Sequence, residues 1–238
     1  MKTLNQYLLE SLLDDEDDLI SNNDILIHQF LKDNYKIDGS YTIKNGIVDV
    51  NGNIALTNYD LEYLTNDLFS FGKVTGNFNA GGVRSVRIKS LKGAPRIAGM
   101  FTVIRSKIKS LEGGPIETGN YNIYYNNYIT DLIGSPKIVN GDFKCYNCDS
   151  LKYIKGTPKK IKGHFDCSEC EELISLEGGP EIVGGDYNCS YCQNLQSIKG
   201  VAEKIGGTLD CSDCTKLLID EVRKEMANIK CKDVFLPK

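Results

Sequence analysis

Nine of the 238 residues of this chain are cysteine, and eight of them form four Cys-x2-Cys pairs in its second half. Two neighbouring pairs of this spacing could supply the four thiolate ligands of a tetrahedral zinc site. The same thiols could form disulfides if adjacent segments bring them close together. The pairs stand at residues 145/148, 167/170, 189/192 and 211/214. Because they recur every 22 residues, each pair belongs to a repeated segment, and the structure of that segment decides how close the thiols lie.

Each pair belongs to a repeat. A β-branched residue is followed by Gly, then by an aromatic residue or Leu, and then by the first Cys, each two positions after the last, as in Val139 to Cys145. A leucine follows six residues after that cysteine, as Leu151 does, and Gly-x-Pro precedes three of the four units, at 134/136, 156/158 and 178/180. The same strand-like pattern, without cysteine, begins five times earlier in the chain, at residues 37, 50, 74, 97 and 117.

The periods of this repeat predict its structure. Alternating apolar and polar residues are typical of a half-buried strand, and Gly-x-Pro is typical of a turn. One such coil cannot bury its apolar row, but stacked coils can, with parallel strands about 4.8 Å apart. We therefore expect a mainly β repeat solenoid, with one short parallel strand in each coil of about 22 residues. It should have about nine coils over residues 37–215, irregular over 37–118 and regular over 119–215.

The order of strand, Cys or Asn, and then Leu resembles the leucine-rich repeat, especially its cysteine-containing variants, over about residues 37–217. Two features differ: Gly precedes the strand where Leu is usual, and no helix is evident on the return side. The segments "SLEGGP", "GGDYNCS" and "LLDDEDDL" are similar in style to repeat proteins of large tailed bacteriophages. The first resemblance implies a protein-binding solenoid. The second implies a factor that acts on a host protein in the host cytoplasm.

Solenoids need atypical ends that cover their apolar faces. Residues 1–36 are predicted to form an acidic N-terminal helical cap, with helices over 3–13 and 24–35. Residues 1–35 carry a net charge of −6, so the rest of the chain carries about +2. Residues 216–238 are predicted to form a C-terminal helical cap and tail, because Leu217, Val222, Met226 and Ile229 recur at helical spacing.

The repeat also bears on the cysteines. In earlier coils the position of Cys145 is taken by aliphatic residues such as Ile123, and that of Cys148 by Asn126 or Ser106. A buried free cysteine behaves as a small hydrophobe with a weak S–H donor, which suits both positions. We therefore favour a cysteine ladder in the core, with no metal and no cofactor, over the alternatives of a zinc site or disulfides between adjacent coils.

Composition excludes several classes of function. Hydrophobic residues make up 41% of the chain and charged residues 25%, as in globular proteins. The net charge of −4 removes the usual electrostatic reason to expect a nucleic-acid partner. No apolar run approaches the ~20 residues that span a bilayer. We expect a cytoplasmic protein with reduced thiols and no membrane partner.

Catalytic residues are scarce. The chain has two histidines. We expect His28, in a predicted cap helix, to pack against its neighbours, and His164, at an outward strand position, to be solvated. No glycine-rich phosphate loop of the P-loop type occurs, and no spacing fixes an acid-base pair. The sequence therefore predicts a protein that is not an enzyme.

Strand alternation places one residue of every two on the outer surface, which we call the strand ridge. Tyrosines with exposed hydroxyls are enriched at protein interfaces, so we expect a protein-docking face centred on Tyr124 and Tyr146. The alternative is that these tyrosines only stabilise the pairing of neighbouring strands and bind no partner. The predicted protein-binding residues are Ile104, Asn122, Tyr124, Tyr125, Lys144, Tyr146, Asp166, Asn188 and Tyr191.

A secondary basic patch consists of Arg84, Arg87, Lys89, Lys92 and Arg96. These cations could contact nucleic acid or an acidic protein, although the aromatic residues expected of a single-strand binder are sparse among them. The alternative is that they are solvated side chains at the edges of the coils. The sequence as a whole favours a non-enzymatic protein-protein interaction module. The alternatives are a zinc-stabilised nucleic-acid-binding module and a structural or assembly component that self-associates.

Overall fold

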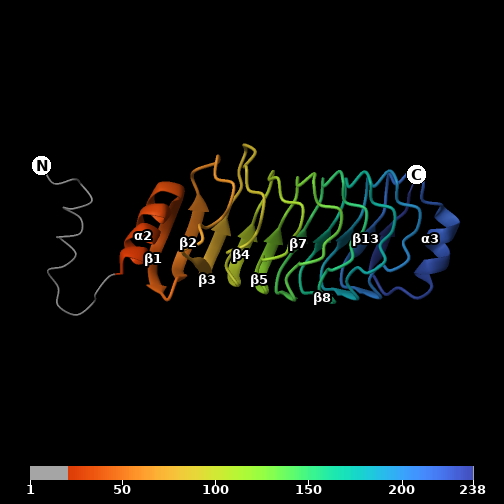
Figure 1. Ribbon diagram of the computed structural model, residues 1–238. Coiled ribbons are helices and arrows are strands. Elements are labelled where there is room, and N and C mark those ends of the chain that lie inside the picture. The colour runs from red at the N-terminus through yellow and green to blue at the C-terminus, as the bar shows by residue number, and fades with distance from the viewer. Residues whose placement is uncertain (1–20, 238) are drawn as a thin grey trace, which may run out of the picture.

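The repeated strand motif forms the rungs of one ladder that runs the length of the molecule and is parallel after its first pair of strands (Figure 1). The computed structural model describes residues 21–237. The predicted fold class is confirmed: a mainly β solenoid of about nine turns, with parallel strands once per coil of about 22 residues and helices at the ends. The strands of the main row are β1 (Tyr35–Lys44), β2 (Ile47–Leu56), β3 (Ser70–Asn79), β4 (Ile97–Thr102), β5 (Glu117–Asn122), β7 (Phe143–Lys144), β9 (Phe165–Asp166), β11 (Tyr187–Asn188), β13 (Thr208–Asp210) and β14 (Asp233–Phe235).

In the regular coils the strand is interrupted near its glycine, so a second row of two-residue strands forms beside the first. This second row consists of β6 (Ile138–Val139), β8 (Lys160–Ile161), β10 (Ile182–Val183) and β12 (Lys204–Ile205). Equivalent residues of successive coils face each other, as Phe143 faces Phe165 and Val139 faces Ile161. The 22-residue spacing of the sequence is therefore the register of the ladder.

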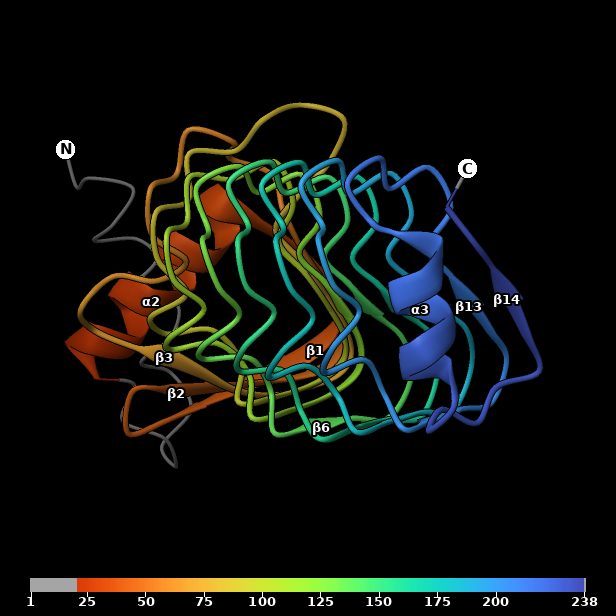
Figure 2. The same ribbon diagram turned by 90° about the vertical axis from the view of Figure 1, so that its right-hand side faces the viewer.

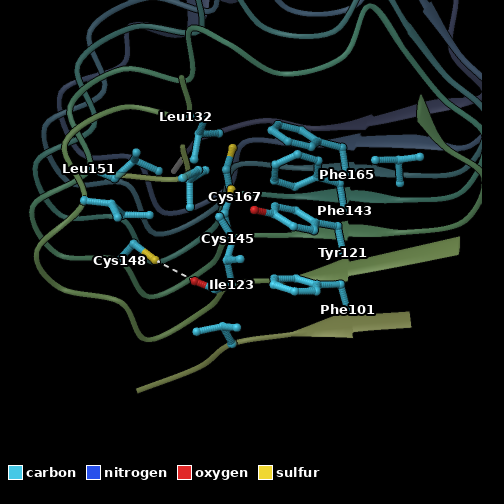
Figure 3. Close-up of a cluster of buried hydrophobic side chains, with 14 of the residues drawn as sticks. Phe101, Tyr121, Ile123, Leu132, Phe143, Cys145, Cys148, Leu151, Phe165 and Cys167 are labelled. Carbon is cyan, nitrogen blue, oxygen red and sulfur yellow. Dashed lines mark hydrogen bonds between the residues drawn. The ribbon is translucent and has the colours of Figure 1, made fainter. Parts of the chain in front are cut away.

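One row of buried aromatic rings fills the centre of the solenoid (Figure 3). The row runs through Phe78, Phe101, Tyr121, Phe143, Phe165 and Tyr187. Neighbouring rings have their centroids between 5.0 and 5.6 Å apart, stacked at first and edge-on later. Because each ring touches only those of the next coils, the core is quasi-one-dimensional, as in other solenoids.

The first two predicted coils require a correction. The strands β1 and β2 pair antiparallel, from Tyr35 opposite Leu56 to Lys44 opposite Ile47, so the prediction of parallel pairing there was wrong. The reason is the Asn45-Gly46 turn, whose positive φ angles of 52° and 70° suit a two-residue hairpin. A spacing of only 13 residues between equivalent glycines is also too short for a return path. Parallel pairing begins between β2 and β3.

The helix α2 (Asn22–Asn34) covers the N-terminal end. Ser21 caps it by accepting a hydrogen bond from the backbone N–H of Asp24, and Ile27 and Leu31 are buried against the first strands. The predicted helix over 24–35 is thus confirmed within one or two residues. The predicted helix over 3–13 lies outside the described residues.

The helix α3 (Ile219–Met226) buries Val222 over the last coil, and the chain then adds a strand (Figure 2). The predicted cap held a helix that included Ile229, but this helix ends at Met226 and residues 233–235 form β14, parallel to β13. A bare β13 edge would leave backbone N–H and C=O groups without partners, and β14 satisfies them. Among residues 21–237, no helix combines the length and apolarity needed to cross a bilayer.

Candidate functional site

The second cysteine of each pair hydrogen-bonds the backbone at a coil corner. The thiols of Cys148, Cys170, Cys192 and Cys214 each donate to a carbonyl oxygen in the preceding coil, at 3.2–3.5 Å. Asn126 does the same one coil earlier, donating to the carbonyl oxygens of Ile123 and Val103 at 2.7 Å. The predicted corner role of these cysteines is therefore confirmed, and Figure 3 shows the bond from Cys148.

The first cysteine of each pair lies in the core beside the aromatic row. Cys145 and Cys167 continue a column that Val103 and Ile123 begin, and all four are fully buried. Burial raises the pKa of Cys145 well above its usual range and raises that of Cys148 to about 12. These thiols stay protonated at neutral pH, whereas nucleophiles and metal ligands must be thiolates.

Metal binding has no preformed geometry in the part of the chain that is described. Across residues 21–237, no group of three or more His, Cys, Asp or Glu side chains is arranged to hold an ion. All nine cysteines are free thiols, and Cys231 is the one that is not buried. The absence of metal and cofactor from the protein stays a prediction.

Outward polar residues connect the coils of the strand ridge. Asp142 accepts a hydrogen bond from the backbone N–H of His164, and Nδ1 of His164 accepts one from the N–H of Asp186, at 2.9 and 3.0 Å. Asp186 in turn accepts one from the N–H of Thr208 at 2.8 Å. This column therefore holds each coil to the next, a structural use of residues that could otherwise be taken for acid-base groups.

The neighbouring column supports the turns that follow the strands. One oxygen of Asp166, Asn188 and Asp210 accepts from both the backbone N–H and the hydroxyl of the serine two residues later, at 2.6–3.1 Å. Between the two columns lies a hollow of about 370 Å³, which Phe235 of β14 also lines. Lys144 projects into it and pairs with Asp142 at 3.6 Å.

Three tyrosines meet at the beginning of the regular coils. The rings of Tyr124 and Tyr146 stack with their centroids 4.5 Å apart and an angle of 9° between them. Tyr125 contacts both edge-on at 5.6 Å, and the guanidinium of Arg105 lies 4.3 Å from the Tyr125 ring centre. We call Arg105, Tyr124, Tyr125 and Tyr146 the tyrosine cluster. Its members are half-buried, so ring faces and edges still meet solvent.

No family model, curated protein or solved structure matches this chain.

The structure brings some predicted binding residues together and separates others. Tyr124, Tyr125 and Tyr146 are in contact, and Asn122 bonds Thr102 across the ladder at 3.2 Å. Tyr191 is 53% exposed but stands three coils from Tyr125, beside Asp213, whose charge raises the Tyr191 pKa. It does not join the cluster.

Ile104 was wrongly assigned to the exposed column. It is only 6% exposed, because β4 ends at Thr102 and the segment at Gly81 of the preceding coil lies directly over it. The sequence reasoning missed Arg105 instead. It occupies the left-handed position that follows each strand, with φ of 52°, as Tyr125 does with φ of 59°. The 20-residue spacing of these two residues was the available signal.

The basic patch is partly neutralised by the preceding coil. Ion pairs join Arg87 to Asp60 at 3.6 Å, Lys89 to Glu62 at 2.7 Å and Lys92 to Asp67 at 3.9 Å. All are exposed to solvent, where such pairs contribute little to stability. Within residues 21–237, Arg84 and Arg96 make no ion pair.

Proposed function

We propose that this protein is a non-enzymatic interaction module that binds a partner protein through its strand ridge. The observation that carries the proposal is the tyrosine cluster: three aromatic rings and one arginine, packed together on the surface of a rigid ladder. Tyrosine and arginine are the residue types that contribute most to protein-binding hot spots.

Rigidity supports this proposal. Tyr124 and Tyr146 project from neighbouring rungs, and their stacking fixes both rings before any partner arrives. Binding therefore loses little side-chain entropy there, which favours affinity. The hydroxyl of Tyr146, whose pKa burial raises to about 12, is neutral at pH 7 as in any tyrosine and can donate a hydrogen bond.

The rest of the ridge offers polar contacts around this centre. From the cluster, Lys144, Asp166 and Asn188 lead along successive rungs to the hollow beside Phe235. With rungs about 4.8 Å apart, the five rungs from Tyr124 to Ser212 extend about 20 Å, a length that suits a partner of ordinary size. A polar surface around an aromatic centre is the usual arrangement of such interfaces.

A finer proposal rests on the repeat pattern. Its resemblance to leucine-rich repeats supports protein binding, and its similarity in style to bacteriophage repeat proteins supports a role in host cells. We propose a phage-encoded factor that inhibits or sequesters a host protein, such as a defence factor, in the host cytoplasm.

The test is affinity capture from the native cytosol with matched variants. The double variant Tyr124→Ser/Tyr146→Ser should fold normally and retain a captured protein at least tenfold less than the natural chain. Tyr153→Ser is the control, because Tyr153 is 48% exposed and lies outside the ridge strands. Equal retention by the double variant would reject this site, and a partner must then be confirmed with purified components.

A further inference from the structure

The segments that connect the early strands carry exposed tyrosines next to cations. Tyr59 lines a hollow of about 550 Å³ together with Arg84, Arg87 and Lys107. Tyr128 lines a second hollow, of about 450 Å³, together with Lys89, Lys107 and Lys109. Lys107 belongs to both, so the two hollows adjoin. We call them the paired hollows.

Stacking of the coils is what brings these residues together. The backbone N–H of Arg87 donates to the backbone carbonyl oxygen of Tyr59 at 3.1 Å, and that of Lys107 donates to the backbone carbonyl oxygen of Ile88 at 2.8 Å, so three successive coils lie edge to edge. The fourth coil adds Tyr128. In the sequence, Tyr59 and Tyr128 stand far from the basic segment 84–96, so the interleaving of aromatic and basic residues emerges only in the folded chain.

Core packing does not account for aromatic side chains at Tyr59 and Tyr128. Tyr128 is 51% exposed and Tyr59 is 38% exposed. Two residues after the coil corner, where Tyr128 follows Asn126, the later coils place only polar side chains. These are Ser150, Glu172, Asn194 and Lys216. An aromatic ring at this position is therefore not required by the repeat.

The charge of the paired hollows is positive. Asp60 neutralises Arg87 and Glu62 neutralises Lys89. Arg84, Lys107 and Lys109 form no ion pair with any residue of 21–237. Glu112 is a further carboxylate that lines the second hollow. The described lining residues still carry more positive than negative charge around the two exposed rings, and the negative net charge of the whole chain does not describe this face.

We propose that the paired hollows bind a single strand of nucleic acid. Arg84, Lys107 and Lys109 would hold the phosphates, and bases would stack on Tyr59 and Tyr128. Proteins that bind single strands without sequence preference combine a positively charged track with aromatic platforms in this way. A duplex fits less well, because its bases are already stacked and the hollows present no helix or strand that could enter a groove. The site is separate from the tyrosine cluster.

The test is fluorescence anisotropy with labelled dT12 and U12 oligonucleotides at low salt. Lys107→Glu/Lys109→Glu should weaken binding at least tenfold and lower the slope of log K against log salt by roughly 1 to 1.5, as loss of two phosphate contacts requires. Tyr59→Ala/Tyr128→Ala should weaken binding about tenfold with the salt slope unchanged. All the substituted side chains are exposed, and a thermal melt checks the fold.

Two controls make the result decisive. Lys160→Glu/Lys204→Glu carries the same charge change on exposed lysines of the second strand row and should bind like the natural chain. Tyr124→Ser/Tyr146→Ser should also bind oligonucleotide normally, which separates this proposal from protein binding on the ridge. The proposal is overturned if neither oligonucleotide binds, if the control lysines matter equally, if the tyrosines have no effect, or if a free mononucleotide competes as well as the oligonucleotide.

Discussion

The hydroxyl of Tyr35 donates a hydrogen bond of 2.6 Å to the backbone carbonyl oxygen of Leu64, inside the core. Among the described residues, the equally buried hydroxyls of Tyr121 and Tyr187 have no hydrogen-bond partner. A buried polar group without a partner costs about 1–3 kcal/mol, whereas a satisfied one stabilises the fold. The same substitution, Tyr to Phe, should therefore change the free energy of unfolding in opposite directions at Tyr35 and Tyr187.

Tyr187→Phe should raise the free energy of unfolding by about 1 kcal/mol, because it removes an unsatisfied hydroxyl and keeps the ring. Tyr35→Phe should lower it by about 1–2 kcal/mol, because the Leu64 carbonyl loses its donor. Urea unfolding followed by circular dichroism measures both. Equal destabilisation by the two variants would show that the Tyr187 hydroxyl has a partner, such as a buried water.

The stacked pair on the ridge should be energetically coupled. A double-mutant cycle with Tyr124→Ala and Tyr146→Ala should give a coupling energy of about 0.5–1.5 kcal/mol, the usual range for aromatic pairs. Urea unfolding of the four proteins provides it. Additive effects would mean that the rings do not interact in solution, and the rigid docking centre would lose its support.

The thiols should differ sharply in reactivity. With a thiol reagent at pH 8, Cys231 should react quickly, because it is half-exposed, and the eight buried cysteines should react only as the chain unfolds. The Cys231→Ser variant should abolish the rapid phase. Rapid modification of more than one thiol in the natural protein would contradict the buried ladder.

Alkaline pH should destabilise the protein. The thiol of Cys148 has a pKa near 9 when the chain is unfolded and about 12 when folded. The folded state therefore binds more protons in this range, and the stability contribution is complete below about pH 9 and is lost as pH rises toward 12. At pH 10 the loss is about 1.4 kcal/mol for one such thiol.

Cys148→Asn isolates this effect, because Asn126 fills the same corner in the preceding coil. Its free energy of unfolding should fall less between pH 8 and pH 10 than that of the natural chain, by about 1.4 kcal/mol. The comparison needs urea unfolding at both pH values under reducing conditions. An identical pH dependence would show that Cys148 is not shielded in the native state.

The hairpin should depend on its glycines. Gly39 and Gly52 face each other with φ angles of 136° and 139°, and a Cβ on either would overlap a backbone oxygen of the other strand. Gly52→Ala should therefore destabilise the protein by about 1–3 kcal/mol, measured by thermal or urea unfolding. Gly82→Ala is the control, since a Cβ there meets only ordinary contacts. Similar stability of the two variants would argue against this hairpin.

The sequence predicted the regular coils well because their register follows directly from spacing. Once Phe143 and Phe165 are equivalent residues of a parallel ladder, their contact and the inward position of Cys145 and Cys167 follow. The corner role of Cys148 was likewise predictable, because Asn126 replaces it in a neighbouring coil.

The errors lie where the spacing changes. The Asn45-Gly46 turn signalled a hairpin, but the repeat pattern on both sides outweighed it in the prediction. Ile104 precedes a coil corner, and its burial depends on the path of the segment near Gly81, which no periodicity specifies. The pairing of β14 with β13 joins segments of unlike sequence. The meeting of Tyr59 with Lys107 depends on three coils at once.

The matched register of the regular coils bears on how this molecule could evolve. Because each of them contacts only its two neighbours through equivalent residues, duplicating or deleting one whole 22-residue unit at the gene level would change the reach of the molecule by about 4.8 Å. The antiparallel hairpin and the closing strand have no such interchangeable copies. Relatives should therefore vary in the number of middle units while keeping both terminators, so that natural selection adjusts length and preserves the ends.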